Sequence, residues 1–189
     1  MVYEPPTEKP VWQRMKFSVR ALAYGITFFL IFALTVAELG LVSEQMHIHG
    51  NSAANYPTLQ YKNVIGILLF SSIATLLFAL THFWASVSSI PFISLILAVF
   101  WGVGAGLLRT GTPYRGTNCT THAHAKYPPA FQPFAGLCKK VVTIQAIAWT
   151  EWALLIMLMV GSLAHKLTIT AKPTPEEMYF EAPEEDAKF

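Results

Sequence analysis

Residues 110–140 read TGTPYRGTNCTTHAHAKYPPAFQPFAGLCKK and form the long polar interruption between the third and fourth of four hydrophobic segments. Of the 189 residues in the chain, 53% are hydrophobic and 13% are charged, whereas ordinary soluble domains carry about 25% charged residues. The hydrophobic segments reach about 20 residues each, enough to cross a hydrocarbon core as a helix. The sequence therefore predicts an all-α membrane protein: a bundle of four transmembrane helices with both termini in the cytosol.

The four segments define one membrane domain over residues 17–165, flanked by a polar tail at residues 1–16 and an acidic tail at residues 166–189. No cleavable signal peptide is expected, because the first hydrophobic segment is too long for one. Two outer loops are expected at 43–62 and 109–140, and a short turn makes the second and third helices a hairpin. The helices are predicted at residues 17–42, 63–85, 90–108 and 141–165.

The sidedness of the chain rests on its charges and on the loop at 109–140. Lysine and arginine are evenly divided between the two sides, but the basic flank of the first helix favours cytosolic termini. Cys119 and Cys138 are the only cysteines, and both lie in the same aqueous loop. On the lumenal side they would form a disulfide, whose closure contributes about 3 kcal/mol. The alternative is two free thiols in the cytosol.

The residues Asn118, Cys119 and Thr120 match the acceptor pattern for N-glycosylation, which operates only on the lumenal side. A cysteine in the middle of the pattern, next to an expected disulfide, leaves glycosylation of Asn118 open. The pattern nevertheless favours placing this loop outside the cytosol, as the paired cysteines do.

Small residues four apart predict close helix packing in two places. Ala21 and Gly25 form one such pair, and Gly102 and Gly106 form a GxxxG pair in the third helix. With Gly104 between them, the glycines also resemble a nucleotide-binding loop. That alternative fails, because no strand precedes them and no helix start follows them.

Two acidic residues stand inside predicted membrane helices. Glu151 lies about 15 Å from the outer end of the fourth helix, where a carboxylate costs a few kcal/mol and must face protein or water. It predicts a proton or ion site, the anchor of a partner helix, or a protonated or hydrogen-bonded structural carboxyl that ties helices together through Gln145 or a serine of the second helix. If Glu38 also faces inward, the two acids would line one polar pocket that opens outward.

The outer loops each contain a His-x-His pair, namely His47 with His49 and His122 with His124. In an extended chain, both imidazoles of such a pair point to one side. Two pairs on the same side of the membrane could bind zinc or copper. The alternative is four exposed loop histidines without a ligand.

The third helix ends in FWGVGAGLL and the fourth begins with CKKVVTIQAIAWTEWALLIML, with a cysteine-bearing loop between them. Over residues 14–166 this pattern resembles the fungal branch of the MARVEL-domain tetraspans. The resemblance implies a non-enzymatic protein that functions in membrane apposition, sterol-rich domains and vesicle trafficking. The positions that carry it are Trp101, Cys119, Cys138, Ala148, Trp149 and Trp152.

The expected function is therefore the organisation or sorting of membranes, at the plasma membrane or in the endomembrane system. The expected partners are membrane lipids, including sterol-rich ones, and further copies of the chain or other membrane proteins. No cofactor and no nucleic acid are expected, since basic residues do not gather with aromatic ones. Two alternatives remain: a small ion- or proton-coupled transporter that uses Glu151 and Glu38, and an accessory subunit of a larger membrane complex.

Overall fold

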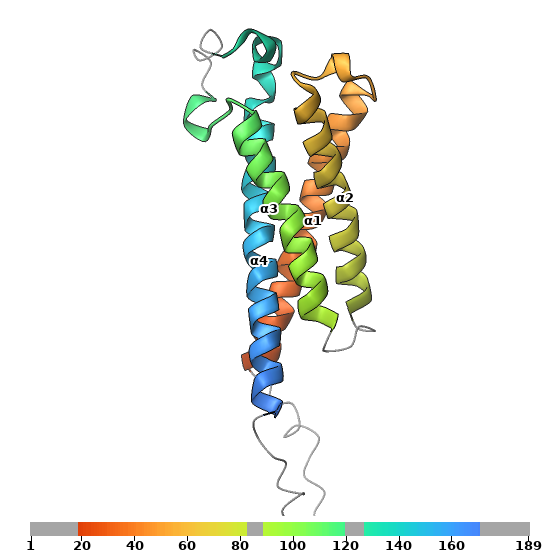
Figure 1. The fold of residues 1–189 in the computed structure, drawn as a ribbon, viewed down its shortest axis with the longest axis vertical. Coiled ribbons are helices and arrows are strands. Elements are labelled where there is room, and N and C mark those ends of the chain that lie inside the picture. The colour runs from red at the N-terminus through yellow and green to blue at the C-terminus, as the bar shows by residue number, and fades with distance from the viewer. Residues whose placement is uncertain (1–18, 83–88, 120–126, 171–189) are drawn as a thin grey trace, which may run out of the picture.

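The computed structural model describes residues 19–82, 89–119 and 127–170. Four long helices run up and down side by side, with the start of the first and the end of the last at the same end of the bundle (Figure 1). Each is long and apolar enough to cross a membrane. The prediction of an all-helical chain with four membrane-length helices is therefore confirmed for the described residues. The helices are α1 (Val19–His49), α2 (Leu59–Thr81), α3 (Ser89–Gly111) and α4 (Cys138–Thr170).

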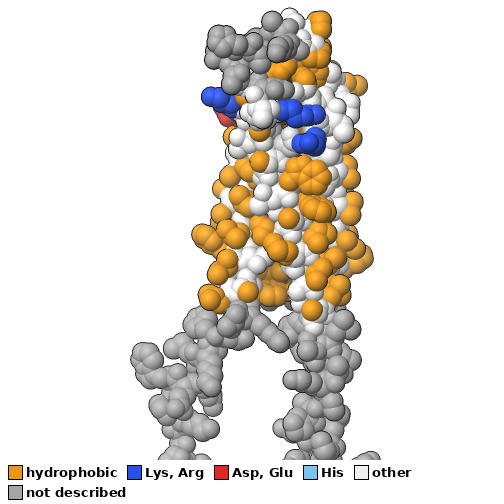
Figure 2. All heavy atoms as spheres, turned by 90° about the vertical axis from the view of Figure 1, so that its left-hand side faces the viewer, with side chains coloured by type: hydrophobic (Ala, Val, Ile, Leu, Met, Phe, Trp, Pro, Cys, Tyr) orange, Lys and Arg blue, Asp and Glu red, His pale blue; other side chains and the backbone are white. Residues whose placement is uncertain are grey.

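The outside of the bundle is apolar along most of its length. Figure 2 shows hydrophobic side chains over the middle of one face and lysine and arginine side chains near its upper end. Large side chains such as Phe29 and Phe92 are about two thirds exposed, at 69% and 65%. Water would disfavour so large an apolar surface, whereas lipid accommodates it. The exposed surface therefore fits a multi-pass membrane protein.

The buried faces of α1 and α4 follow a seven-residue repeat. Fully buried positions alternate in steps of three and four, as in helices that pack along a shallow left-handed supercoil. In α1 they include Ile31, Thr35, Glu38, Val42 and Gln45, and in α4 they include Val141, Ile144, Ala148, Glu151, Leu155 and Leu158.

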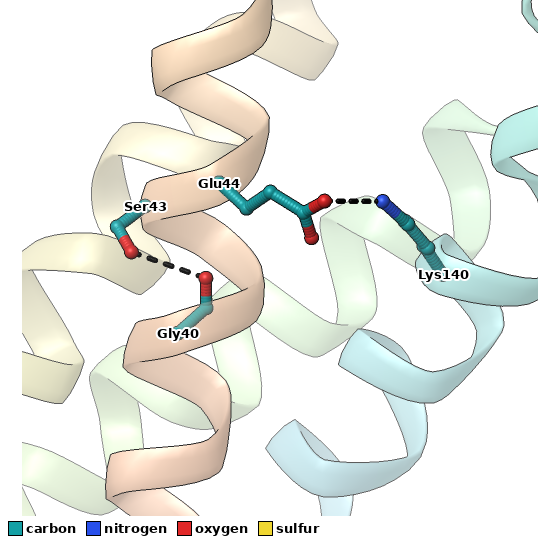
Figure 3. Close-up of polar contacts among 4 residues, drawn as sticks. All are labelled: Gly40, Ser43, Glu44 and Lys140. Carbon is teal, nitrogen blue, oxygen red and sulfur yellow. Dashed lines mark hydrogen bonds and ion pairs between the residues drawn. The ribbon is translucent and has the colours of Figure 1, made fainter.

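Helix α1 continues to His49, although the sequence predicted its end at residue 42. The polar residues after Val42 ended the hydrophobic segment but not the helix, because backbone hydrogen bonds do not depend on side-chain polarity. Gln45 stays on the buried face and Glu44 bonds to Lys140 of α4 at 2.6 Å (Figure 3). The outer end of α1 therefore extends beyond its apolar part and is held there by a neighbouring helix.

The other helices also differ from the predicted ranges at their ends. Helix α2 begins at Leu59, where the Thr58 side chain accepts a hydrogen bond from the backbone N–H of Tyr61 and so caps the helix. Helix α4 begins at Cys138 and runs to Thr170. The outer loops are correspondingly shorter than predicted.

A compact cap closes the outer end of α3 and α4. It contains two 3-10 segments, η4 (Gly116–Asn118) and η6 (Pro129–Leu137), and the disulfide between Cys119 and Cys138. Tyr114 is fully buried at its centre, and its hydroxyl donates to the Phe134 carbonyl at 2.9 Å. Burial raises the pKa of Tyr114 to about 12, so the hydroxyl keeps its proton near neutral pH. The predicted disulfide is present and is part of this packed unit.

Candidate functional site: a polar cluster inside the bundle

The candidate site is built around Glu151, which lies in α4 and is fully buried. The Thr35 hydroxyl of α1 donates a hydrogen bond to Oε1 of Glu151 at 2.9 Å. Its second oxygen, Oε2, has no hydrogen-bond partner among the described residues. The carboxyl group therefore joins α4 to α1 through one bond and retains one unused acceptor in an apolar interior.

Glu38 is the second member of the site and comes one turn after Thr35 on the buried face of α1. Its side chain is fully buried, and neither carboxyl oxygen has a hydrogen-bond partner in the described part of the chain. It lies close enough to Glu151 for the two groups to interact electrostatically. Both acids thus face inward. Neither side chain is exposed in the described structure, and a pocket shared by the two acids stays a prediction.

Hydroxyl groups of α2 lie on the buried side of the same bundle. Ser71 and Ser72 are fully buried, but each donates to a backbone carbonyl of its own helix, at 2.8 Å. Thr75 instead accepts a bond from the Trp101 indole of α3 at 2.9 Å. The four helices therefore all contribute polar side chains to the interior, and part of that polarity is satisfied across helix boundaries.

The sequence missed the residue that bonds to Glu151. The proposed structural partners were Gln145 and a serine of the second helix, whereas the observed partner is Thr35. Gln145 is buried, but it lies nearly two turns closer to the outer end of α4. The seven-residue spacing of α1 places Thr35, Glu38 and Gln45 on one face, so the repeat indicates that Thr35 faces the interior but not which residue it meets there.

The glycines of α3 contact two different helices. A Cβ atom added to Gly102 would lie 2.9 Å from Cδ1 of Trp152, and one added to Gly104 would lie 2.5 Å from Cδ2 of Leu68. Apart from the helix's own backbone and the flanking residues, no described atom lies within 4 Å of the corresponding position at Gly106. Close packing of α3 against its neighbours therefore involves Gly102 and Gly104. Of the predicted GxxxG pair, Gly102 makes such a contact and Gly106 does not.

The other predicted small pair shows no such contact. Gly25 is exposed, and an added Cβ would meet open space there. The Ala21 side chain lies outside the described residues. Within the described residues, Gly25 therefore makes no close contact with another helix.

We expect Gly104→Leu to destabilise the protein, because the new side chain must displace Leu68. Overpacking a filled core costs about 1–3 kcal/mol, which lowers the midpoint of thermal unfolding in detergent. Gly106→Leu is the matched control on the same helix and should leave the midpoint within error of the unmodified protein. Equal midpoints for the two variants would contradict the close contact of α3 with α2.

The His-x-His pair of the first outer loop lies in the last turn of α1 and not in an extended chain. Side chains two apart in a helix point about 200° apart, so His47 and His49 do not converge. His49 packs its ring against Tyr56 and Phe134. The described residues contain no group of three or more His, Cys, Asp or Glu side chains placed to hold a metal. His122 and His124 lie outside the described residues.

Three further predicted residues are Asn118 at the cap and the tryptophans Trp149 and Trp152 of α4. Asn118 is the last residue of η4, and its side chain is outside the described ones. Trp149 and Trp152 of α4 form an edge-to-face pair with ring centres 5.6 Å apart. Both are partly exposed, and Trp152 also covers Gly102. They therefore combine helix packing with contact to the surroundings.

These features define a bundle of four membrane-length helices with a disulfide-bonded cap at one end and two buried carboxyl groups inside. No family model, no curated protein and no solved structure matches the chain. The similarity to the MARVEL tetraspans therefore stays a prediction from the quoted motifs.

Proposed function

We propose that the protein organises membrane domains or sorts membrane components, without enzymatic activity, as the MARVEL tetraspans that it resembles do. The observation that carries this proposal is the filled interior of the bundle. One large side chain from each helix is fully buried there: Ile31, Leu68, Trp101 and Leu155. A packed bundle of this kind acts through its outer surface and its shape.

The outer surface supports the same proposal. Apolar side chains cover the helices, and the α1 face around Gly25 is open. Such a face can contact lipid or a neighbouring transmembrane helix. We place the termini in the cytosol, on the basis of the basic flank of α1 and the disulfide in the outer cap. Plasma membrane or endomembranes, including sterol-rich regions, are the proposed location.

The proposal is tested by expressing the full chain with a fluorescent label and measuring how it clusters and where it localises. We expect clusters in both the unmodified protein and Glu151→Gln, because the carboxyl group is enclosed and does not contact a membrane partner. Photobleaching steps report the number of chains in each cluster. Uniformly distributed single chains would contradict a role in organising membrane domains.

A proton- or ion-coupled carrier is the second candidate, and the buried Glu38–Glu151 pair favours it. Carriers place ionisable side chains inside the membrane, where a change of charge can drive a rearrangement. In sealed liposomes with a pH gradient, the full chain would then carry protons or a coupled ion. Glu151→Gln would abolish that flux, while Glu44→Gln, which changes an exposed glutamate of the same charge, would preserve it.

A further inference from the structure

A groove of about 370 Å³ lies along the outer half of α2, flanked by Met46 of α1 and Phe100 of α3. It is independent of the carboxyl pair, which lies inside the bundle. Its volume falls in the range of about 300–1,000 Å³ that is usual for small-molecule sites. The α2 residues that line it are Lys62, Asn63, Gly66, Ile67 and Phe70.

The outer end of the groove is polar and positively charged. Lys62 stands one turn into α2, and its ammonium group donates to the backbone carbonyl of Asn51. Among the described residues the one ion pair joins Lys140 to Glu44, so no described carboxylate neutralises Lys62. A lysine near a helix end extends its charge to the level of the lipid headgroups. The adjoining Asn63 is exposed and adds a neutral hydrogen-bonding group.

The inner end of the groove is apolar and has a gap in its wall. Gly66 provides the gap, since among the described residues no neighbouring helix or loop places an atom within 4 Å of where its Cβ would be. Below it, Phe70 and Phe100 meet edge to face with ring centres 5.6 Å apart. Lys62 and Phe70 are eight residues apart, which corresponds to about 12 Å along the helix. The groove therefore changes from charged to apolar with depth, as a phospholipid does.

We propose that this groove binds one anionic phospholipid, with its negatively charged headgroup at Lys62 and Asn63 and an acyl chain over Gly66. The acyl chain continues past Ile67 to the aromatic pair of Phe70 and Phe100. Charge selects this occupant over others: a sterol carries no anion for Lys62. A second copy of the protein would have to present a carboxylate at headgroup depth.

The test uses the full-length protein in mixed micelles of phosphatidylserine and phosphatidylcholine with identical acyl chains. Native mass spectrometry then counts the lipids retained per chain. We expect one phosphatidylserine to be retained in preference to phosphatidylcholine by about tenfold, the size of one charge-assisted contact. Equal retention of the two lipids, or retention of added cholesterol in their place, would overturn the proposal.

Two variants, each with a matched control, locate the site. Lys62→Gln should reduce the preference for phosphatidylserine to near one, whereas Lys139→Gln, at an exposed lysine of α4, should leave it at about tenfold. Gly66→Leu should fill the groove and reduce retention of both lipids. Gly106→Leu, at a glycine that is equally open, should leave retention unchanged. Unchanged lipid binding in Lys62→Gln or in Gly66→Leu would place the lipid elsewhere.

Discussion

Replacing Glu38 and Glu151 together by methionine is expected to raise the free energy of unfolding by about 1–4 kcal/mol. Three of the four carboxyl oxygens have no hydrogen-bond partner among the described residues, although both side chains are fully buried. The free energy cost of transferring two such groups from water to the interior exceeds the stabilisation from the single hydrogen bond that Thr35 donates. The unbranched methionine side chain occupies a similar volume, and the freed Thr35 hydroxyl can bond to its own helix.

The measurement is unfolding of the full chain in detergent or in a bilayer mimic, followed by helical circular dichroism. Glu44→Gln provides the control, because it removes a glutamate from an exposed ion pair that contributes about 0–1 kcal/mol. A double variant that is less stable than the unmodified protein would show that the carboxyl pair holds α1 and α4 together. In that case the buried acids would contribute directly to the stability of the bundle.

The second large effect is expected from the disulfide of the outer cap. Replacing Cys119 and Cys138 together by serine should lower the free energy of unfolding by about 3 kcal/mol, because the unfolded chain regains the freedom of the closed loop. The four helices should still form, since their apolar faces do not depend on the cap. Unfolding of oxidised protein, reduced protein and the double serine variant provides the comparison.

Reduced wild-type protein and the double serine variant should unfold at the same denaturant concentration, below that of the oxidised protein. Cys119→Ser alone should lower the free energy of unfolding by the same amount but leave one buried thiol at Cys138, which maleimide labels once the protein is unfolded. If reduction left the unfolding midpoint unchanged, the packing of Tyr114 and Phe131 would hold the cap without the bond.

The number and type of the helices could be predicted because a membrane span requires a long apolar segment. Their ends could not, because hydropathy reports the depth of a residue rather than its backbone conformation. Residues 43–49 show the difference: they are polar, and yet they continue α1. The cap was foreseen through its cysteines, whereas the burial of Tyr114 depends on side chains that only the folded loop brings together.

The candidate site was only partly predictable for a related reason. The cost of a charge in lipid indicated that Glu151 faces inward, and it does. Which residue would bond to it depends on the vertical alignment of α1 with α4, and no pattern within one helix fixes that alignment. The Thr35–Glu151 bond and the Glu44–Lys140 ion pair together define it.

Helix α4 has 33 residues and so extends about 50 Å, well beyond the hydrocarbon thickness of about 30 Å. Its apolar segment, residues 141–165, is also somewhat longer than that thickness, so tilt and small shifts along the membrane normal leave the depth of an isolated α4 open. Its first residue, Cys138, is bonded to Cys119 in the cap that follows α3. The disulfide thus fixes the height of α4 relative to α3, and with it the level of Glu151 within the bundle.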